Sequence, residues 1–513
     1  MPYTVVWFKR DLRVQDHAAL TAAAARGPVL CLYIVEPSLW AAPDAARQHY
    51  HFVLESLREV YRALRALGGR LHVVGGEVTE VLGRLHAAAP FDALYAHEET
   101  GNALSFERDL AVARWCRAQG VAWREFAQFG VVRRLRDRGE WQARWEMFVA
   151  QPCLPVPAAL RFVPLPLPWS DTAPPDADAL GLPTGEPPLR QRGGRVEAMR
   201  TLMDFLQARS QQYRGGISSP LRAPTACSRI SPYLAFGCIS LREVVQATRL
   251  QIASLPPSAT RHRAGLNAFI SRLYWHCHFI QKLESEPELE TRNLHRGYDG
   301  LREADWNPQH FAALSAGRTG WPLVDACVAM LRETGWLNFR MRAMLVSVAA
   351  YPLWLHWQPV GGWLARQFLD YEPGIHWPQM QMQSGTTGIN VPRIYNPIKQ
   401  AHDQDPDGRF VRHWLPWMRR VPDSWLFEPW RMPDSLQRDL GLRPGEEIPR
   451  PPVDLEHATR MARERLFARR ADPMVRAAKP AIVDKHGSRR RTPRPRAKAP
   501  VPATAAGQLK LAF

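Results

Sequence analysis

A proline-rich segment divides this chain into two parts that must fold differently. Between residues 152 and 188, eleven of 37 residues are proline, and two pairs of them are adjacent. Proline lacks the backbone N–H and clashes with a preceding helical turn, so this density excludes a helix or a central strand. We expect an extended connector with a folded domain on either side, which the length of 513 residues also favours.

The part before the connector alternates short apolar runs with longer amphipathic segments. This alternation predicts strands joined by crossover helices, and hence a parallel, Rossmann-like α/β domain. The expected strands are residues 4–8, 29–35, 70–74, 93–97 and 121–126, and the expected covering helices are residues 45–67 and 104–119. Neither GxGxxG after the first strand nor GxxxxGK[ST] occurs, so the usual dinucleotide and P-loop interpretations lose support.

The part after the connector is predicted to be all-α. Segments rich in Arg, Leu and Ala carry apolar residues at helical spacing, over residues 195–209, 242–254, 264–283, 322–333 and 339–356. We expect four regions: an α/β domain over 1–133, the connector over 134–194, a helical domain over 195–475 and a basic tail over 476–513. The tail is too charged and too poor in apolar residues to bury a core, which predicts disorder.

Charge and cysteine content narrow the class of function. The formal net charge of +18 predicts a polyanionic partner, above all nucleic acid. The seven cysteines form no CxxC pair, so we expect neither a zinc ribbon nor a disulfide framework, and a reducing cytoplasm fits. The sequence has no signal-peptide pattern and no apolar run of ~20 residues, which predicts a soluble protein without a membrane span.

Four ordered motifs resemble those of the photolyase and cryptochrome family. They are residues 6–13 (VWFKRDLR), 225–234 (TACSRISPYL), 334–342 (TGWLNFRMR) and 393–416, which are similar to the family's opening segment, phosphate-cradling turn, flavin wall and closing segment. With the spacing between them, the resemblance covers about residues 3 to 430. It implies that the helical domain holds FAD. It also allows a second, antenna chromophore, whose identity no motif specifies.

The resemblance assigns cofactor-binding roles in the helical domain. Arg342 would set the charge near the isoalloxazine with Asp370 as its partner, and His376 would face flavin N5, where an imidazole titrates near neutrality. Ser228 and Ser231 would offer a helix start to the pyrophosphate, although such a turn is by itself more often a plain helix cap. The expected cofactor residues are Tyr213, Cys227, Ser228, Arg229, Ile230, Ser231, His276, Trp336, Phe339, Arg342, Asp370, Glu372 and His376.

The resemblance implies light-driven repair of cyclobutane pyrimidine dimers by electron donation from excited reduced FAD to a flipped-out dimer in UV-damaged DNA. Trp275 matches the family's stacking tryptophan, although a buried helix-face indole is an equally common reason for such a residue. Arg340 matches a cation at the dimer, and Gln400 matches a glutamine that approaches DNA. The reaction needs neither a protein nucleophile nor a metal.

Several positions on the side of the site that would face the DNA lesion, here called the lesion side, depart from the family pattern. Arg272 replaces a glutamate, Phe339 an asparagine, Ala343 a methionine or histidine, and Met382 the second stacking tryptophan. Members specific for the (6-4) lesion commonly carry histidine at the positions of Phe339 and Ala343, so the departures favour cyclobutane dimers. We assign catalytic positions to Trp275, Arg340, Arg272 and Met382. The alternative is a cryptochrome-type photoreceptor that binds FAD and repairs nothing.

The electron-transfer chain of the family is altered here. Trp357 and Trp306 match its middle and outer tryptophans, whereas Met380 takes the place of the flavin-proximal one. A thioether is a poorer relay than an indole. Either light-driven reduction of the flavin is weak, or another aromatic residue passes the electron in place of residue 380. The candidates are Trp377, Trp354 and Tyr371.

Two further patterns concern metals and partners. His276, Cys277 and His278 are adjacent on an expected helix, where side chains point about 100° apart, so they do not converge as metal ligands. No cysteine follows Cys327, which argues against the iron–sulfur cluster of one family branch. The final residues 508–513 (QLKLAF) resemble the Gln-x-x-Leu-x-Phe pattern that docks into the bacterial sliding clamp, against the alternative of an unstructured end. We expect a monomer.

Overall fold

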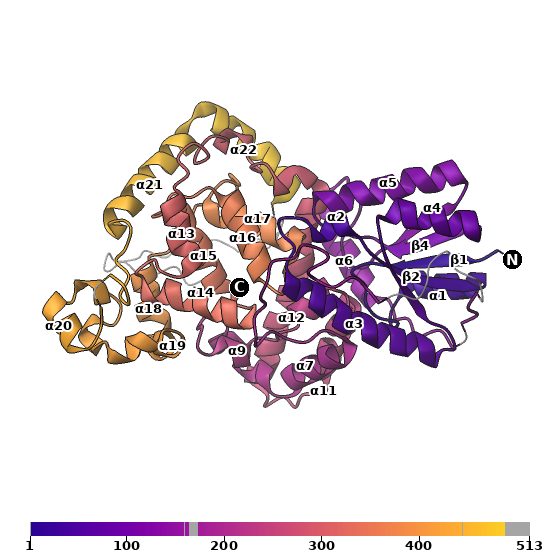
Figure 1. Ribbon diagram of the computed structural model, residues 1–513, viewed down its shortest axis with the longest axis horizontal. Helices are drawn as coiled ribbons and strands as arrows, with labels where there is room; N and C mark the ends of the chain where they lie inside the picture. The colour runs from indigo at the N-terminus through magenta and orange to yellow at the C-terminus, as the bar shows by residue number, and fades with distance from the viewer. Residues whose placement is uncertain (1, 159, 164–172, 444, 488–513) are drawn as a thin grey trace.

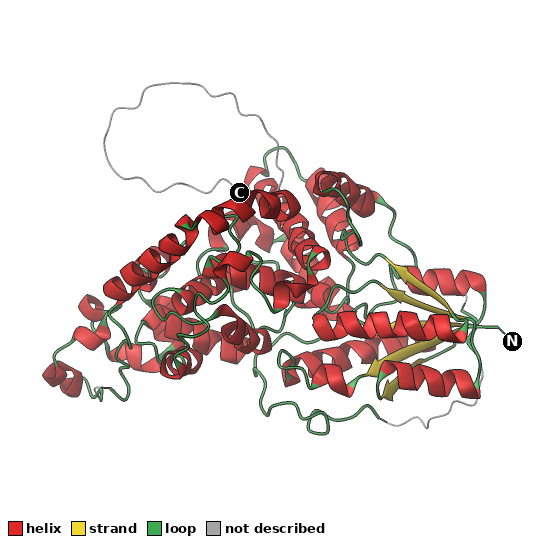
Figure 2. Ribbon diagram, turned by 90° about the horizontal axis from the view of Figure 1, so that it is seen from above, coloured by secondary structure: helices red, strands yellow, loops and turns green. Residues whose placement is uncertain are grey.

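The computed structural model describes residues 2–158, 160–163, 173–443 and 445–487 (Figure 1). Five parallel strands form one sheet in the order β3-β2-β1-β4-β5. Their bounds are β1 (Thr4–Phe8), β2 (Val29–Val35), β3 (Leu71–Gly75), β4 (Ala93–His97) and β5 (Ala122–Phe126). The predicted strands are confirmed to within one residue at each end. Figure 2 shows that the sheet occupies the end of the molecule that carries the N-terminus.

Alternate residues of each strand pack on opposite faces of the sheet, as its pleat requires. Val6 and Phe8 contact the side covered by α1 (Ala18–Arg26) and α3 (Arg47–Ala66). Val5 and Trp7 pack on the other side, under α4 (Val78–Ala88) and α5 (Ala103–Gln119). The helices α1 and α4 were not predicted. The small residues of α1 give little apolar periodicity.

The rest of the described chain is mostly helical, which confirms the predicted fold class. The longer helices are α6 (Trp141–Ala150), α7 (Arg195–Gln207), α11 (Leu241–Ser254), α12 (Thr260–Ser285), α13 (Pro308–Ala316), α14 (Pro322–Thr334), α15 (Phe339–Ala350), α16 (Trp357–Gln367), α17 (Pro373–Ser384), α18 (Pro397–Gln404), α21 (Leu455–Ala471) and α22 (Pro473–His486). The central helix α17 packs against α12, α15 and α16. None of the described helices is long and apolar enough to cross a membrane.

Three sequence-based boundaries differ from the structure. The helix predicted to reach residue 356 ends as α15 at Ala350, because Pro352 cannot continue a helix. The region expected to be a connector contains α6, which packs on α11. The basic tail begins later than expected, because α22 extends to His486. Lys485 Nζ and His486 Nε2 lie 2.9 and 2.8 Å from the carboxylate of Glu286. The clamp-like hexapeptide lies outside the described residues.

The α/β domain and the helical domain are joined by contacts of the β1–α1 loop. Arg10 donates from Nε to the carbonyl of Ala235 at 2.8 Å and from Nη2 to that of Tyr371 at 2.9 Å. Gly237 has φ +66°, and a Cβ there would lie 2.2 Å from the carbonyl oxygen of Arg10. Only glycine fits this close approach. Arg10, in the loop after the first strand, therefore contacts residues 370–372 directly and holds them in place at the domain interface.

Candidate active site

A buried carboxylate joins three segments of the helical domain. Asp370, which precedes α17, accepts a hydrogen bond from Ser231 Oγ at 2.6 Å, at the start of α10 (Ser231–Ala235). Arg342 of α15 places Nη2 2.9 and 3.0 Å from the two oxygens of Asp370 and donates from Nε to the carbonyl of Leu337. The expected pair of Arg342 and Asp370 is present. Their contact with a flavin stays a prediction.

The turn before α10 carries a partly buried arginine. Arg229 has the left-handed φ of +59°, which is uncommon for a residue with a side chain. Its guanidinium lies 4.1 Å from the ring centroid of Trp336 and donates to Gln191 Oε1. Burial lowers the pKa of Arg229 to about 10, although Asp370 opposes this shift. A cation that is only partly compensated favours an anion beside it, such as a pyrophosphate.

Two predicted cofactor residues have environments that the sequence did not reveal. His376 Nε2 lies 2.9 Å from the carbonyl oxygen of Gly361, so Nε2 carries the proton. Burial lowers the pKa of His376 to about 4, and the expectation that this ring titrates near neutrality is wrong. Glu372 turns toward the α/β domain, where its carboxylate lies 3.3 Å from Arg10 Nη2.

The remaining predicted cofactor residues other than Phe339 are buried or partly buried. Ile230 is buried, and Cys227 and Ser228 are partly buried beside Arg229. Burial raises the pKa of Tyr213, an effect that Arg272 partly offsets. Burial lowers the pKa of His276 to about 4, so its ring is neutral as it packs 5.2 Å from Phe129.

The residues expected on the DNA side are more open. Phe339, the first residue of α15, is 51% exposed. Arg340 follows it, and within the described residues its buried Nε has no hydrogen-bond partner. Trp275 is partly buried, with its ring 4.8 Å from that of His278, and Met382 is also partly buried. Gln400 is only 9% exposed, so its side chain is less accessible than a direct DNA contact would suggest.

Aromatic side chains near α17 form a connected group. The rings of Trp357 and Trp377 lie 5.9 Å apart at 71°, and Trp357 Nε1 donates to Asn293. Met380 is buried in the same hydrophobic cluster, and Trp306 packs at its edge, 5.2 Å from Phe311. In contrast, Trp354, a candidate for an alternative electron-transfer route, belongs to another hydrophobic cluster. Its ring lies between two arginines, Arg302 and Arg465.

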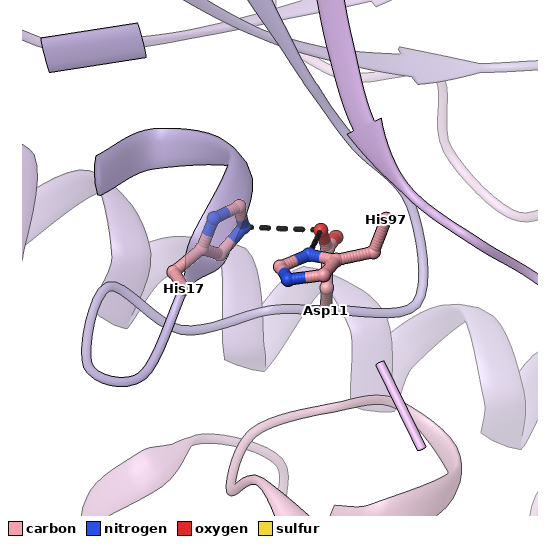
Figure 3. A group of neighbouring side chains, drawn as sticks. All are labelled: Asp11, His17 and His97. Carbon is pink, nitrogen blue, oxygen red and sulfur yellow. Dashed lines mark hydrogen bonds and ion pairs between the residues drawn. The ribbon is translucent and has the colours of Figure 1, made fainter. Parts of the chain in front are cut away.

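A second polar cluster lies where β1 and β4 end (Figure 3). Asp11 Oδ2 is 2.7 Å from His97 Nδ1 and 3.0 Å from His17 Nε2, and all three residues are buried. His17 Nδ1 accepts the backbone N–H of Leu20 at 3.0 Å, so the ring proton is on Nε2 and is directed at Asp11. The two histidines lower the pKa of Asp11 against the effect of its burial. The hydrogen bond to His97 and the close contact with His17 therefore account for this cluster.

The geometry coincides with matches to known proteins. A model described as the FAD binding domain of DNA photolyase matches residues 269–468, and one described as DNA photolyase matches residues 4–133. Cryptochrome DASH of Gloeobacter violaceus is 31% identical over 479 residues, which covers 88% of this chain and 93% of that protein. The chain belongs to the photolyase and cryptochrome family.

Both branches of the photolyase and cryptochrome family occur among the relatives. The deoxyribodipyrimidine photo-lyase of Vibrio cholerae is 29% identical and covers 84% of this chain and 93% of its own length. A class III photolyase from Agrobacterium tumefaciens shares the fold, with a TM-score of 0.79, 24% identity and coverage of 92% and 98%. An archaeal photolyase from Sulfolobus tokodaii has a TM-score of 0.73, 24% identity and coverage of 91% and 99%. It is described with two FAD molecules, with the implication of a novel light-harvesting cofactor.

The residues around Asp370 fit an FAD. The charge of the partly buried Arg229 is incompletely compensated, and Arg342 and Ser231 are held in place by a shared carboxylate. Asn338, just before α15, has a buried Oδ1 that lacks a partner among the described residues. Sequence reasoning missed the supporting residues Gln191 and Arg10, since neither lies in the helical-domain motifs.

Proposed function

We propose that this protein is a deoxyribodipyrimidine photo-lyase that repairs cyclobutane pyrimidine dimers in DNA under blue light. The observation that carries the proposal is the start of α15, where Arg342 belongs to the buried Asp370 cluster and Phe339, one turn earlier, is an exposed aromatic beside Arg340. One short helix thus joins a cofactor site to a surface suited to a base. Reduced FAD, when bound, supplies a photoexcitable one-electron donor.

The cofactor side of the site holds charged groups in fixed positions. Asp370 orients Arg342 and Ser231, and Arg229 supplies a second cation for the phosphates. His376 stays neutral with its proton on Nε2, which leaves Nδ1 as an acceptor for an N–H of a reduced flavin. The protein therefore binds and orients the cofactor without a titrating group at this position near pH 7.

The lesion side recognises a base that has left the DNA stack. Phe339 and Trp275 offer aromatic faces, and stacking of one base on such a face contributes about 1–3 kcal/mol. Arg340 supplies a cation next to Phe339. A dimer pairs poorly, so flipping it out costs less than flipping a normal base. The net charge of +18 favours the DNA backbone as the partner.

A cryptochrome-type photoreceptor is the second candidate. Two observations favour it: Met382 stands where a second stacking tryptophan is usual, and Gln400 is largely buried. Such a protein would bind FAD and leave dimers intact. We also propose that the protein is a cytoplasmic monomer.

We further propose that a second, light-harvesting chromophore binds between the two domains. A cavity of about 510 Å³ lies there, within the range of about 300–1,000 Å³ that is usual for ligand pockets. Its lining combines apolar and charged groups, including Asn102, Phe106, Arg134, Glu284 and Lys485. The two FAD molecules described for the archaeal relative support this proposal.

The test uses the purified, FAD-loaded protein and an oligonucleotide with one cyclobutane dimer. We expect intact pyrimidines to return under blue light and not in a dark control. Flavin-loaded protein that leaves the dimer intact in the light would support the photoreceptor instead. Protein that takes up no FAD on reconstitution would contradict both candidates.

A further inference from the structure

A hydrogen-bonded chain leads from α17 into the α/β domain. Trp377 Nε1 donates to Tyr371 Oη at 3.1 Å, and Tyr371 Oη lies 2.6 Å from Asp44 Oδ2. An indole N–H can only donate and an ionised carboxylate can only accept, so the phenol must donate to Asp44. All three side chains are buried, and the distance of 2.6 Å is that of a charge-assisted O–H···O⁻ bond.

The indole at the start of this chain is next to the altered electron-transfer position. Trp377 precedes Met380 by three residues on α17, and positions i and i+3 share one face of a helix. Both belong to the hydrophobic cluster of Trp357, and the Trp377 ring contacts that of Trp357 edge-on. The indole missing at Met380 thus has a counterpart one turn earlier on the same face.

We propose that Trp377, Tyr371 and Asp44 form a proton-coupled electron relay that ends on a tyrosyl radical and reduces the flavin in the light. The proposal rests on the flavin binding of the proposed function. In the first step Trp377 loses one electron to the photoexcited, oxidised flavin. In the second step Tyr371 returns one electron to Trp377 and transfers its phenolic proton to Asp44.

The second step conserves both atoms and charge. A cationic tryptophan radical, a neutral tyrosine and an aspartate anion become a neutral tryptophan, a neutral tyrosyl radical and a protonated Asp44. The O–H bond of Tyr371 breaks and an O–H bond forms on Asp44 Oδ2. No positive charge remains on Trp377 or Tyr371. Return of the electron from the flavin to Tyr371 therefore requires that the proton also move back from Asp44.

The groups around Asp44 connect it to a cavity through which the proton can reach solvent. Asn102 Nδ2 donates to both oxygens of Asp44, at 3.3 and 3.1 Å, and holds the carboxylate in place. Asn102 also lines the cavity of about 510 Å³ between the domains. Glu290 lines the same cavity, and burial raises the pKa of Glu290 to about 7. The proton that reaches Asp44 is therefore close to groups that can exchange it with solvent.

Flash photolysis of the full-length protein with oxidised FAD tests the relay. We expect a long-lived absorption signal of a neutral tyrosyl radical, formed more slowly in D₂O than in H₂O. Tyr371→Phe should abolish this signal, leave a tryptophanyl radical that recombines faster, and lower the yield of flavin photoreduction. Tyr351→Phe is the matched control, because Tyr351 is a fully buried tyrosine of the same domain that is not part of the hydrogen-bonded relay. It should keep the tyrosyl signal.

A second variant separates the relay from a purely structural network. Asp44→Asn keeps a carbonyl oxygen that can accept the phenol hydrogen bond but cannot take up the proton. We expect normal FAD content, loss of the tyrosyl signal and loss of the D₂O effect. A tyrosyl signal that persists in Tyr371→Phe or Asp44→Asn would overturn the relay. So would a flavin-loaded wild type that forms only tryptophanyl radicals, whereas a protein that binds no flavin would overturn the proposed function itself.

Discussion

The cofactor side and the lesion side of the candidate site are built in opposite ways. On the cofactor side, Asp370 receives donors from Ser231 and Arg342, and the side chains are packed in place. On the lesion side, Phe339 is half exposed and the buried Nε of Arg340 lacks a partner among the described residues. The side chains of the first site are therefore held in place by contacts within the chain, whereas the second leaves an aromatic ring exposed at the surface.

The two sides also differ in how closely they follow the family. Among the hydrogen-bonded and ion-paired residues of the cofactor side, Arg229, Ser231 and Arg342 follow the motifs, whereas Phe339 and Met382 on the more open side depart from them. A substitution within a hydrogen-bonded cluster leaves a buried group without its partner, which is costly. An exposed side chain can be exchanged at little cost to stability. The open side is therefore where specificity can change.

Arg342→Ala gives the largest expected effect, on the cofactor side alone. Asp370 would lose its cation, and the loss of a charge-assisted contact of about 1.5–3 kcal/mol should weaken FAD binding about ten- to hundredfold. The visible flavin absorption of the purified protein measures this loss. The exposed Arg332 provides the control Arg332→Ala, which should stay yellow. Full FAD occupancy in Arg342→Ala would contradict the assignment of the cofactor site.

Phe339→Ala should affect the lesion side alone. Loss of a stacking face worth about 1–3 kcal/mol should weaken binding of dimer-containing DNA about five- to hundredfold. Although Phe339 is also among the expected cofactor residues, it is 51% exposed, so FAD content should stay unchanged. A titration with labelled oligonucleotide measures the affinity. Phe467, which is 43% exposed on α21, gives the matched control Phe467→Ala. Equal affinity in wild type and Phe339→Ala would show that this ring does not contact the lesion.

Trp357→Phe should separate photoreduction from repair. The indole of Trp357 lies 5.9 Å from Trp377 and can supply it with an electron in parallel with Tyr371, so its loss should slow light-driven reduction of the flavin several-fold. Repair by chemically pre-reduced protein should change little, because that reaction needs no electron from Trp357. Trp321→Phe, at another fully buried tryptophan of the same cluster, is the control. Photoreduction that is unchanged in Trp357→Phe would remove Trp357 from the pathway.

Deletion of residues 488–513 should weaken DNA binding mainly at low salt. The segment contains six of the seven Lys and Arg residues between 485 and 498, and each phosphate contact adds about 0.9 to the log–log salt slope. Affinities measured over a series of salt concentrations give this slope. A shorter deletion of residues 503–513 keeps the basic run and should keep the slope. An unchanged slope after the longer deletion would mean that the run does not contact DNA.

The smallest effect concerns the end of the chain, which we propose as a sliding-clamp ligand. A peptide of residues 505–513 should bind a labelled bacterial clamp at about 100 μM or below, which is roughly 5.5 kcal/mol. Replacement of Leu511 and Phe513 by alanine should abolish binding. Equal binding of both peptides, or none, would end this proposal. Repair activity should be the same with and without the hexapeptide.

The sequence by itself determined the positions and bounds of the strands along the chain and the change to a helical domain. Periodicity of two and of about 3.6 residues is a local property, so it can be read without the fold. The sequence also indicated the pair of Arg342 and Asp370 through the family motifs, and the structure has this ion pair. The short, alanine-rich α1 escaped prediction because alanine marks neither face of a helix.

Only the tertiary structure decided which groups meet across the chain and which of them are buried. Tyr371 contacts Asp44, and Arg10 contacts Glu372, although each pair is more than 300 positions apart. The neutral state of His376 follows from its burial, which no neighbouring residue in the sequence encodes. Burial and long-range hydrogen bonds arise from packing of the whole chain, and they set the charge and proton position of each group in the site.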